Sequence, residues 1–259
     1  TLPGVARASH IWTDKDGTEY IAIGTSKGLF LFYGGGIYDI SPLETAITGL
    51  TFTSTNGSAT VTVNKTSHNL TAGEFVVFSS VTMPGSGTGF TAANFTDNPF
   101  QIITAATNSF TITMPSSESG SGMTAAGSGS VQAYVPVGSA TQTLGFGWGT
   151  GTWNGSTAWG SATSASTTTL EPGNWSLDNY GTILIATIKN GGTFEWNPTD
   201  GVTTRATAVT TNPTASVMTI VSDTDRHLIH LGTETTIGSI GTQDKMFIRF
   251  SDQEDRTDY

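Results

Sequence analysis

Four acidic residues scattered along the chain could supply the carboxylate pair that hydrolyses a glycosidic bond. In that chemistry one carboxyl group protonates the leaving oxygen, and a second one attacks the sugar or activates water. The two groups must face each other across a cleft, so the fold has to bring them together. The candidates are Asp39, Asp178, Glu195 and Asp223.

The segment TDKDGTEY, residues 13–20, is close to the Asp-box turn of propeller sialidases. Its Asp and Gly residues stand at other offsets than in that turn. Asp and Gly favour tight turns, because Asp bonds its own backbone and Gly accepts a positive φ. We therefore interpret the segment as a turn between two strands. No serine lies in an evident strand-to-helix elbow of the kind that hydrolases use.

The chain contains four histidines and no cysteine, so a metal site would have to combine imidazole and carboxylate ligands. His227 and His230 are three residues apart in an expected strand, and such side chains point to opposite faces. We interpret both as ordinary strand or edge positions. His10 and His68 complete the set.

The terminal stretch SDQEDRTDY is acidic, and Ca²⁺ favours several carboxylate oxygens. The twelve-residue loop with a central Gly is missing, however. An acidic edge that faces solvent or a neighbouring subunit is the better interpretation. Its carboxylates belong to Asp252, Glu254, Asp255 and Asp258.

Three tryptophans follow one another in a Gly- and Thr-rich stretch, at spacings of five and six: Trp148, Trp153 and Trp159. These spacings do not place the rings on one face of a strand. Such rings can stack on sugars, or they can anchor a long loop against a sheet or a neighbouring subunit. We favour packing, and treat the three as candidate interface or glycan contacts.

Composition narrows the classes of function. The formal net charge is −10 and only 12% of residues are charged, about half the usual share. A chain this acidic is a poor candidate for binding the phosphates of nucleic acid, although DNA can pass it without binding. No stretch approaches the roughly 18 apolar residues of a membrane span. Because the chain starts without Met, we expect a piece of a longer protein or a processed one.

Similar stretches recur at residues 11–42, 174–198 and 217–259. Each runs from a polar turn through an apolar strand, a Gly-containing turn and a second apolar strand. Repetition of one all-strand unit predicts an all-β protein with a β-propeller-like body. Three units are fewer than the roughly four to eight blades of a closed propeller. Either further strands lie in 138–173 and the insert, or the body is incomplete.

Residues 51–135 differ in composition from the rest of the chain and are rich in Thr, Ser and Gly. This composition predicts an inserted small β-barrel or sandwich. Its alternating stretches are typical of half-buried strands. We expect a hairpin that pairs Phe100–Thr104 with Ser109–Met114 and a flexible loop over residues 116–130. The expected domains are thus 1–50 and 136–259 for the body and 51–135 for the insert.

The ordered motifs resemble tail proteins of tailed bacteriophages, namely the nozzle, hub or stabilisation proteins below the portal. The resemblance covers residues 4–50 and 138–259, about two-thirds of the chain. The most specific motifs are GTSKGLFLFYGGGIYDISP, WSLDNYGTILIA and IRFSDQEDRTDY. None of them is catalytic, so the resemblance rests on their joint order.

This resemblance implies a virion tail protein without enzymatic activity or cofactor. It implies a propeller-like body in a homo-oligomeric, six-fold ring around the DNA channel. The ring would contact the portal or adaptor and a tail fibre or needle, without a membrane. It would close the channel after packaging, while double-stranded DNA passes without specific binding. A carbohydrate-binding adhesin module and a propeller glycosidase are the alternatives.

Overall fold

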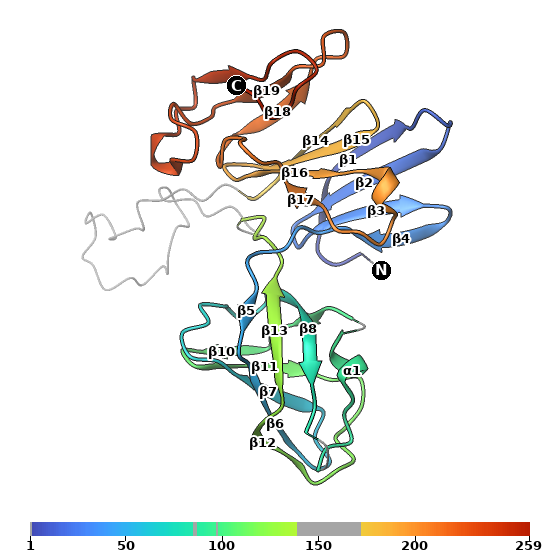
Figure 1. Ribbon diagram of the computed structural model, residues 1–259, viewed down its shortest axis with the longest axis vertical. Coiled ribbons are helices and arrows are strands. Elements are labelled where there is room, and N and C mark those ends of the chain that lie inside the picture. The colour runs from blue at the N-terminus through green and yellow to red at the C-terminus, as the bar shows by residue number, and fades with distance from the viewer. Residues whose placement is uncertain (1, 85–86, 97, 139–171) are drawn as a thin grey trace, which may run out of the picture. The chain divides into compact units, whose positions relative to one another are not determined.

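Alternating short strands account for nearly all regular structure in this chain, and the all-β prediction is confirmed. The computed structural model describes residues 2–84, 87–96, 98–138 and 172–259 (Figure 1). Contacts divide the chain into two units. The first comprises Thr1–Ile40, Val137–Thr204 and Ala208–Tyr259, and the second comprises Ser41–Pro136 and Arg205–Thr207. The second unit thus begins ten residues before the expected boundary at residue 51.

Within the described residues, the first unit contains three antiparallel sheets, each ordered as in the sequence, and the last strand of the second sheet begins at Thr207, at the boundary of the two units. The first sheet has strands β1 Ala6–Thr13, β2 Glu19–Thr25, β3 Leu29–Tyr33 and β4 Gly36–Asp39. The second has β14 Trp175–Tyr180, β15 Ile183–Ile188, β16 Thr193–Trp196 and β17 Thr207–Ala208. The third has β18 Met218–Val221, β19 Leu228–Leu231 and β20 Ile248–Phe250. Two 3₁₀ turns lie at Pro198–Asp200 and Ile240–Thr242.

Turn chemistry explains where these strands reverse. Between β1 and β2, the Asp14 Oδ1 atom accepts hydrogen bonds from the backbone nitrogens of Asp16 and Thr18, both at 2.9 Å. These bonds lower the pKa of the Asp14 carboxyl group, the bond from Thr18 most. Residues 14–18 therefore form the turn between β1 and β2, and the rest of 13–20 lies in the two strands. Between β15 and β16, Asn190 takes a φ of 59° beside Gly191, as tight hairpins require.

The first and second sheets pack through aromatic side chains. Trp12 stacks on Tyr20 with 5.4 Å between ring centroids, and both rings meet Trp196 of the second sheet edge-on. Beside them, the Trp175 Nε1 atom donates to the Thr25 carbonyl oxygen at 2.9 Å. A Cβ atom on Gly24 would lie 2.5 Å from the Trp175 ring. The close approach of the two sheets therefore requires glycine at this position.

The second unit consists of two sheets around one core, and neither sheet closes into a barrel. One sheet has strand order β10-β11-β7-β6-β12 and the other β5-β13-β8-β9. Their aromatic side chains meet between the sheets, with Phe78 6.1 Å from Phe52 and 6.4 Å from Phe110. The unit is therefore a sandwich, and the barrel alternative is wrong because the edges of the sheets do not pair.

The strands of the second unit are short, and their bounds are β5 Ile47–Thr48, β6 Thr51–Thr55, β7 Thr60–Asn64, β8 Phe75–Thr82, β9 Phe100–Gln101, β10 Thr104–Ala106, β11 Ser109–Thr113, β12 Gly122–Ala126 and β13 Ser128–Ala133. One short helix, α1 Ala92–Thr96, buries Phe95 in the core. The expected loop at 116–130 is wrong, because much of it forms β12 and the start of β13. The expected hairpin forms only between β10 and β11, since β9 pairs with β8.

Candidate functional site

Hydroxyl groups line part of the contact between the second and third sheets, beside an apolar cluster of Tyr180, Ile185 and Leu228. The Thr187 Oγ1 atom lies 2.9 Å from Thr193 Oγ1 and 2.8 Å from Thr219 Oγ1. The Ser176 hydroxyl donates to the Thr219 carbonyl oxygen at 2.7 Å. The threonine side chains are buried, and such buried hydroxyls must bond one another because water does not reach them. The two sheets are thus joined by a polar ladder of side chains.

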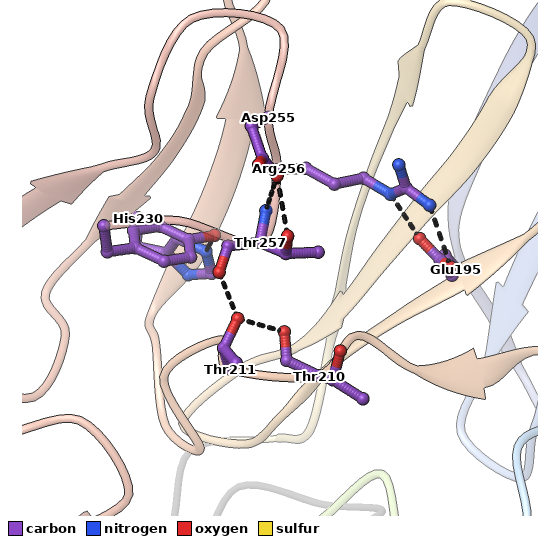
Figure 2. A network of polar contacts seen from close by, with 8 residues as sticks. Glu195, Thr210, Thr211, His230, Asp255, Arg256 and Thr257 are labelled. Atoms are coloured by element: carbon purple, nitrogen blue, oxygen red, sulfur yellow. Dashed lines mark hydrogen bonds and ion pairs between the residues drawn. The ribbon is translucent and has the colours of Figure 1, made fainter.

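A buried histidine, labelled in Figure 2, belongs to a second polar network. His230 has its Nδ1 atom 2.9 Å from Ser216 Oγ and its Nε2 atom 2.8 Å from the Tyr259 hydroxyl. The Ser216 Oγ atom lies 3.0 Å from Thr233 Oγ1, which in turn donates to the Ala215 carbonyl oxygen. The network therefore runs from Tyr259 through the imidazole to the backbone.

The protons of this network can be assigned from its last bond. The single proton of Thr233 is given to a carbonyl oxygen, so Ser216 must donate to Thr233. Ser216 then accepts from His230 Nδ1, and His230 Nε2 accepts from the Tyr259 hydroxyl. Burial, with the positive charge of Arg249, lowers the pKa of His230 to about 4, which agrees with a neutral ring.

Ser216 and His230 have the spacing of a nucleophile and its base, but the direction of the bond is reversed. A catalytic histidine accepts the serine proton, whereas this one donates to the serine. Both residues are also fully buried. The pair is therefore suited to holding sheets together. Sequence reasoning missed it, because no local pattern links residues that meet only in the fold.

The terminal segment, residues 252–259, folds back onto the second sheet (Figure 2). Arg256 donates two hydrogen bonds to the Glu195 carboxylate, from Nε at 2.5 Å and from Nη2 at 3.0 Å. Asp255 accepts from the backbone nitrogen and hydroxyl of Thr257, and the Thr257 carbonyl oxygen accepts from the Thr211 hydroxyl. The segment thus ties the third sheet to the second.

The candidate glycosidase carboxylates come together only in part. Asp178 and Glu195 lie in one cross-strand row, on either side of the buried Ile185. Each is already bound, because Asp178 Oδ2 accepts from the Val221 nitrogen at 2.7 Å and Glu195 binds an arginine. Asp39 lies in β4 of the first sheet and Asp223 in an exposed turn. The four carboxylates do not line one cleft.

The remaining histidines bind protein groups. His10 Nε2 lies 2.8 Å from Asn179 Oδ1, His68 Nε2 lies 2.7 Å from the Ala106 carbonyl oxygen, and His227 Nδ1 lies 2.7 Å from the Ser251 carbonyl oxygen. Within the described ranges, no group of three or more His, Asp or Glu side chains could hold a metal ion. Asp252, Glu254, Asp255 and Asp258 are exposed.

One serine pattern escaped the sequence reasoning. Residues 24–28, GTSKG, match G-x-S-x-G, the elbow that presents a hydrolase serine between a strand and a helix. Here they form the turn between β2 and β3, and Ser26 Oγ accepts from the Val5 nitrogen at 3.1 Å. The strand-to-helix setting is missing, so the pattern is a hairpin turn.

Among the described residues of the second unit, Glu118 is a buried carboxylate without a cation. Glu118 accepts bonds from the backbone nitrogens of Gly89 and Gly120 at 2.5 and 2.9 Å, and from the hydroxyls of Ser54 and Thr88 at 2.7 and 2.9 Å. Burial alone would raise its pKa, but these four bonds outweigh burial and lower the pKa to about 2. The carboxylate fastens two loops to β6.

Trp148, Trp153 and Trp159 lie outside the described residues. Their assignment as interface or glycan contacts stays a prediction.

Comparison with known proteins does not assign this chain to a family. No family model and no curated protein matches it. Among solved structures it is similar to Phage phi92 endosialidase, with 13% identity and a TM-score of 0.27 over 97% of this chain. The chain spans 38% of the length of that protein. At this TM-score the likeness carries no argument about the fold or activity of this chain. In the part that the structure describes, no helix has the length and apolar character to cross a membrane.

Proposed function

We propose that this protein is a structural component of a bacteriophage tail. It forms part of a nozzle or hub below the portal and adaptor, in a homo-oligomeric ring, six-fold as the resemblance of its motifs to such proteins implies. The ring builds part of the DNA channel wall, closes it after packaging and attaches fibres or a needle.

One observation carries this proposal: the motifs of the phage-tail resemblance are the parts that join sheet to sheet. WSLDNYGTILIA forms β14 and most of β15, and Asp178 within it binds the third sheet. IRFSDQEDRTDY forms β20 and the terminal segment whose Arg256 binds Glu195. Side chains that would have to be free for chemistry are used in packing. This use supports a wall-building role.

Charge supports the same role. A channel wall must let DNA slide, and Lys or Arg clusters would hold its phosphates. With 20 acidic and 10 basic residues, the chain carries an excess of negative charge that repels the duplex. DNA then passes without specific binding.

The proposal is tested on phage particles. Mass spectrometry of purified virions should find the protein, and electron microscopy with a specific antibody should locate it at the tail, next to the portal. Particles made without it should fill with DNA and then lose it, whereas complementation restores retention. DNA-filled, infectious particles that lack the protein would contradict the proposal.

A further inference from the structure

The terminal segment, residues 252–259, is bound to the first unit by a small set of side chains. Three of its residues are half-buried and face the unit: Arg256, Thr257 and Tyr259. Its other residues are exposed. The groups that hold it come from the second sheet, the loop before the third sheet and β19. We call these four residues the acceptor site: Tyr180, Glu195, Thr211 and His230.

Two groups of the terminal segment are recognised at the second sheet and the loop that follows it (Figure 2). Glu195 accepts two hydrogen bonds from the Arg256 guanidinium, which also lies 5.8 Å from the centroid of the Tyr180 ring. The Thr211 hydroxyl donates to the carbonyl oxygen of Thr257. The acceptor site thus binds one cation and one backbone carbonyl.

A third group is recognised at the third sheet. The Tyr259 hydroxyl lies 2.8 Å from His230 Nε2, and the two rings meet edge-on with 5.3 Å between their centroids. Without the terminal segment, His230 and Glu195 would lose these partners, which is costly for polar groups shielded from water. The acceptor site therefore requires an occupant with an arginine, a carbonyl oxygen and a tyrosine hydroxyl at the spacing of residues 256, 257 and 259. A second copy of this chain carries the same occupant.

The turn that returns the terminal segment to its own body is strained. Glu254 has a φ of 59°, in the left-handed region that residues other than glycine adopt at a cost. Three backbone bonds close the turn: Asp255 N to Asp252 O and Glu254 N to Arg226 O, both at 3.3 Å, and Asp252 N to Asp258 O at 2.8 Å. All five residues are exposed, so water can take over these bonds when the turn opens.

The same turn gathers like charges. Four carboxylates lie within seven residues, at Asp252, Glu254, Asp255 and Asp258. Their mutual repulsion decreases when the chain extends. Short connecting turns under strain favour exchange of the segment that they carry between copies. Once extended, residues 252–255 span about 13 Å, at roughly 3.3 Å per residue.

We propose that the terminal segment is exchanged between copies, so that the segment of one copy occupies the acceptor site of another copy of this chain. The contacts at the acceptor site are the same within one chain and between two chains. The turn therefore decides between the two arrangements, and it is strained only when closed. One-way donation from copy to copy closes a ring. The inference deepens the proposed ring-forming role and rests on it for its biological setting.

Sedimentation velocity of the purified full chain over a concentration series tests the exchange. We expect the unchanged chain to associate as concentration rises. Arg256→Glu disables the terminal segment and Glu195→Arg disables the acceptor site, so each variant alone should remain monomeric. Mixed in equal amounts, they should form a heterodimer, because the intact segment of one variant meets the intact acceptor site of the other.

Lys15→Glu and Glu19→Arg are the matched controls, since they make the same changes of charge at exposed positions of the first sheet. Both should associate as the unchanged chain does. Circular dichroism and thermal melts verify folding of every variant, and Arg256→Gln or Glu195→Gln replaces a charge reversal that fails to fold.

Two substitutions of Glu254 test the turn without touching the acceptor site. Glycine accepts the positive φ, so Glu254→Gly should favour the closed turn and weaken association by about fivefold. Proline cannot take a positive φ, so Glu254→Pro should open the turn and strengthen association by a similar factor. Both variants lose the same carboxylate, and the difference between them therefore reports the backbone alone.

An unchanged chain that stays monomeric throughout the series would overturn the inference, as would association that survives both charge reversals. Equal association of the Gly and Pro variants would also overturn it. A monomeric chain that is nevertheless found in the tail would remove this inference and leave the proposed function standing. Exchange of the terminal segment in a protein absent from virions would do the reverse.

Discussion

His230 is a base that the folded protein prevents from titrating in its usual range. Its bonds are compatible with the neutral ring, and its pKa falls from 6.5 to about 4 because the ring is buried near Arg249. Between these two pKa values the unfolded chain binds more protons than the folded chain. Stability therefore rises with pH across this window and is lost as pH falls through it.

We expect the free energy of unfolding of the first unit to decrease, on the order of 3 kcal/mol, as pH falls from 6.5 to 4. Urea titrations followed by tryptophan fluorescence measure this change, since the second unit contains no tryptophan. His230→Gln should flatten the profile, because an amide does not titrate. His227→Gln, at a partly exposed histidine, is the control. If the free energy of unfolding of the His230→Gln variant changed with pH as steeply as that of the unchanged chain, the assignment would be refuted.

Gly24 limits how closely the first and second sheets approach. A methyl group there would meet the Trp175 ring at 2.5 Å, so the ring or the strand must move. We expect Gly24→Ala to lower the free energy of unfolding by about 1–3 kcal/mol, as overpacking does. Gly241→Ala is the matched control, because nothing lies within 4 Å of its added Cβ atom. Equal unfolding midpoints for the two variants would contradict the close approach.

Residue types in the sequence identified the histidines and carboxylates but not their partners. The polar network from Tyr259 to Ala215 joins segments that are distant in the chain, and no spacing rule connects them. Glu195 was a candidate for catalysis because a carboxylate looks the same in sequence whether it is free or bound. Its pairing with Arg256 depends on the return of the terminal segment.

Strands with apolar alternation were predictable from the sequence, and strands rich in polar residues were not. The apolar runs Leu29–Tyr33 and Thr193–Trp196, within the repeated units 11–42 and 174–198, form β3 and β16. The unit 174–198 was expected to begin with a polar turn, yet its first residues, Trp175–Tyr180, form β14, whose Ser and Asp bond the third sheet. The strand β12, in a Gly- and Ser-rich run, forms by pairing with β6.

Two loops of the second unit are held by one carboxylate. Glu118→Ala would leave four donors without an acceptor, and Glu118→Gln would turn an amide donor toward some of them. We expect either change to lower the free energy of unfolding of this unit by about 2–4 kcal/mol. Scanning calorimetry measures the loss, and tryptophan fluorescence should show the first unit unchanged. Glu44→Gln, at an exposed carboxylate, is the control; comparable losses in both variants would exclude the specific role.

At the scale of the molecule, the main segment of the second unit, Ser41–Pro136, begins and ends with two paired stretches of chain. Leu43 forms a bridge with Tyr134, and the Val135 nitrogen donates to the Pro42 carbonyl oxygen at 3.0 Å. The hydrophobic core of the second unit lies wholly within residues 50–133. A unit of this size with its own core can fold alone.

We expect residues 41–136, expressed alone, to fold cooperatively, and the full chain with residues 43–134 replaced by a short Gly linker to keep its first unit. Pro42 and Val135 are hydrogen-bonded neighbours, so the linker has little distance to cover. Calorimetry of both pieces and of the full chain gives the comparison. Loss of the aromatic circular dichroism of the first unit after excision would show that the units depend on each other.

The three sheets of the first unit pack one on the next. The hydroxyl ladder makes the contact between the second and third sheets weaker than the contact between the first and second. Aromatic rings join the first and second sheets, and water cannot replace what they bury. The contact between the second and third sheets combines the apolar cluster of Tyr180, Ile185 and Leu228 with hydroxyl bonds. Water can take over the bonds of Thr187, Thr193 and Thr219, each worth only about 1 kcal/mol net. The stack should thus part first at this polar seam, and amide hydrogens of β18 should exchange with solvent before those of β2. A tail wall built this way would yield under internal pressure at a defined joint while its aromatic joint stays shut.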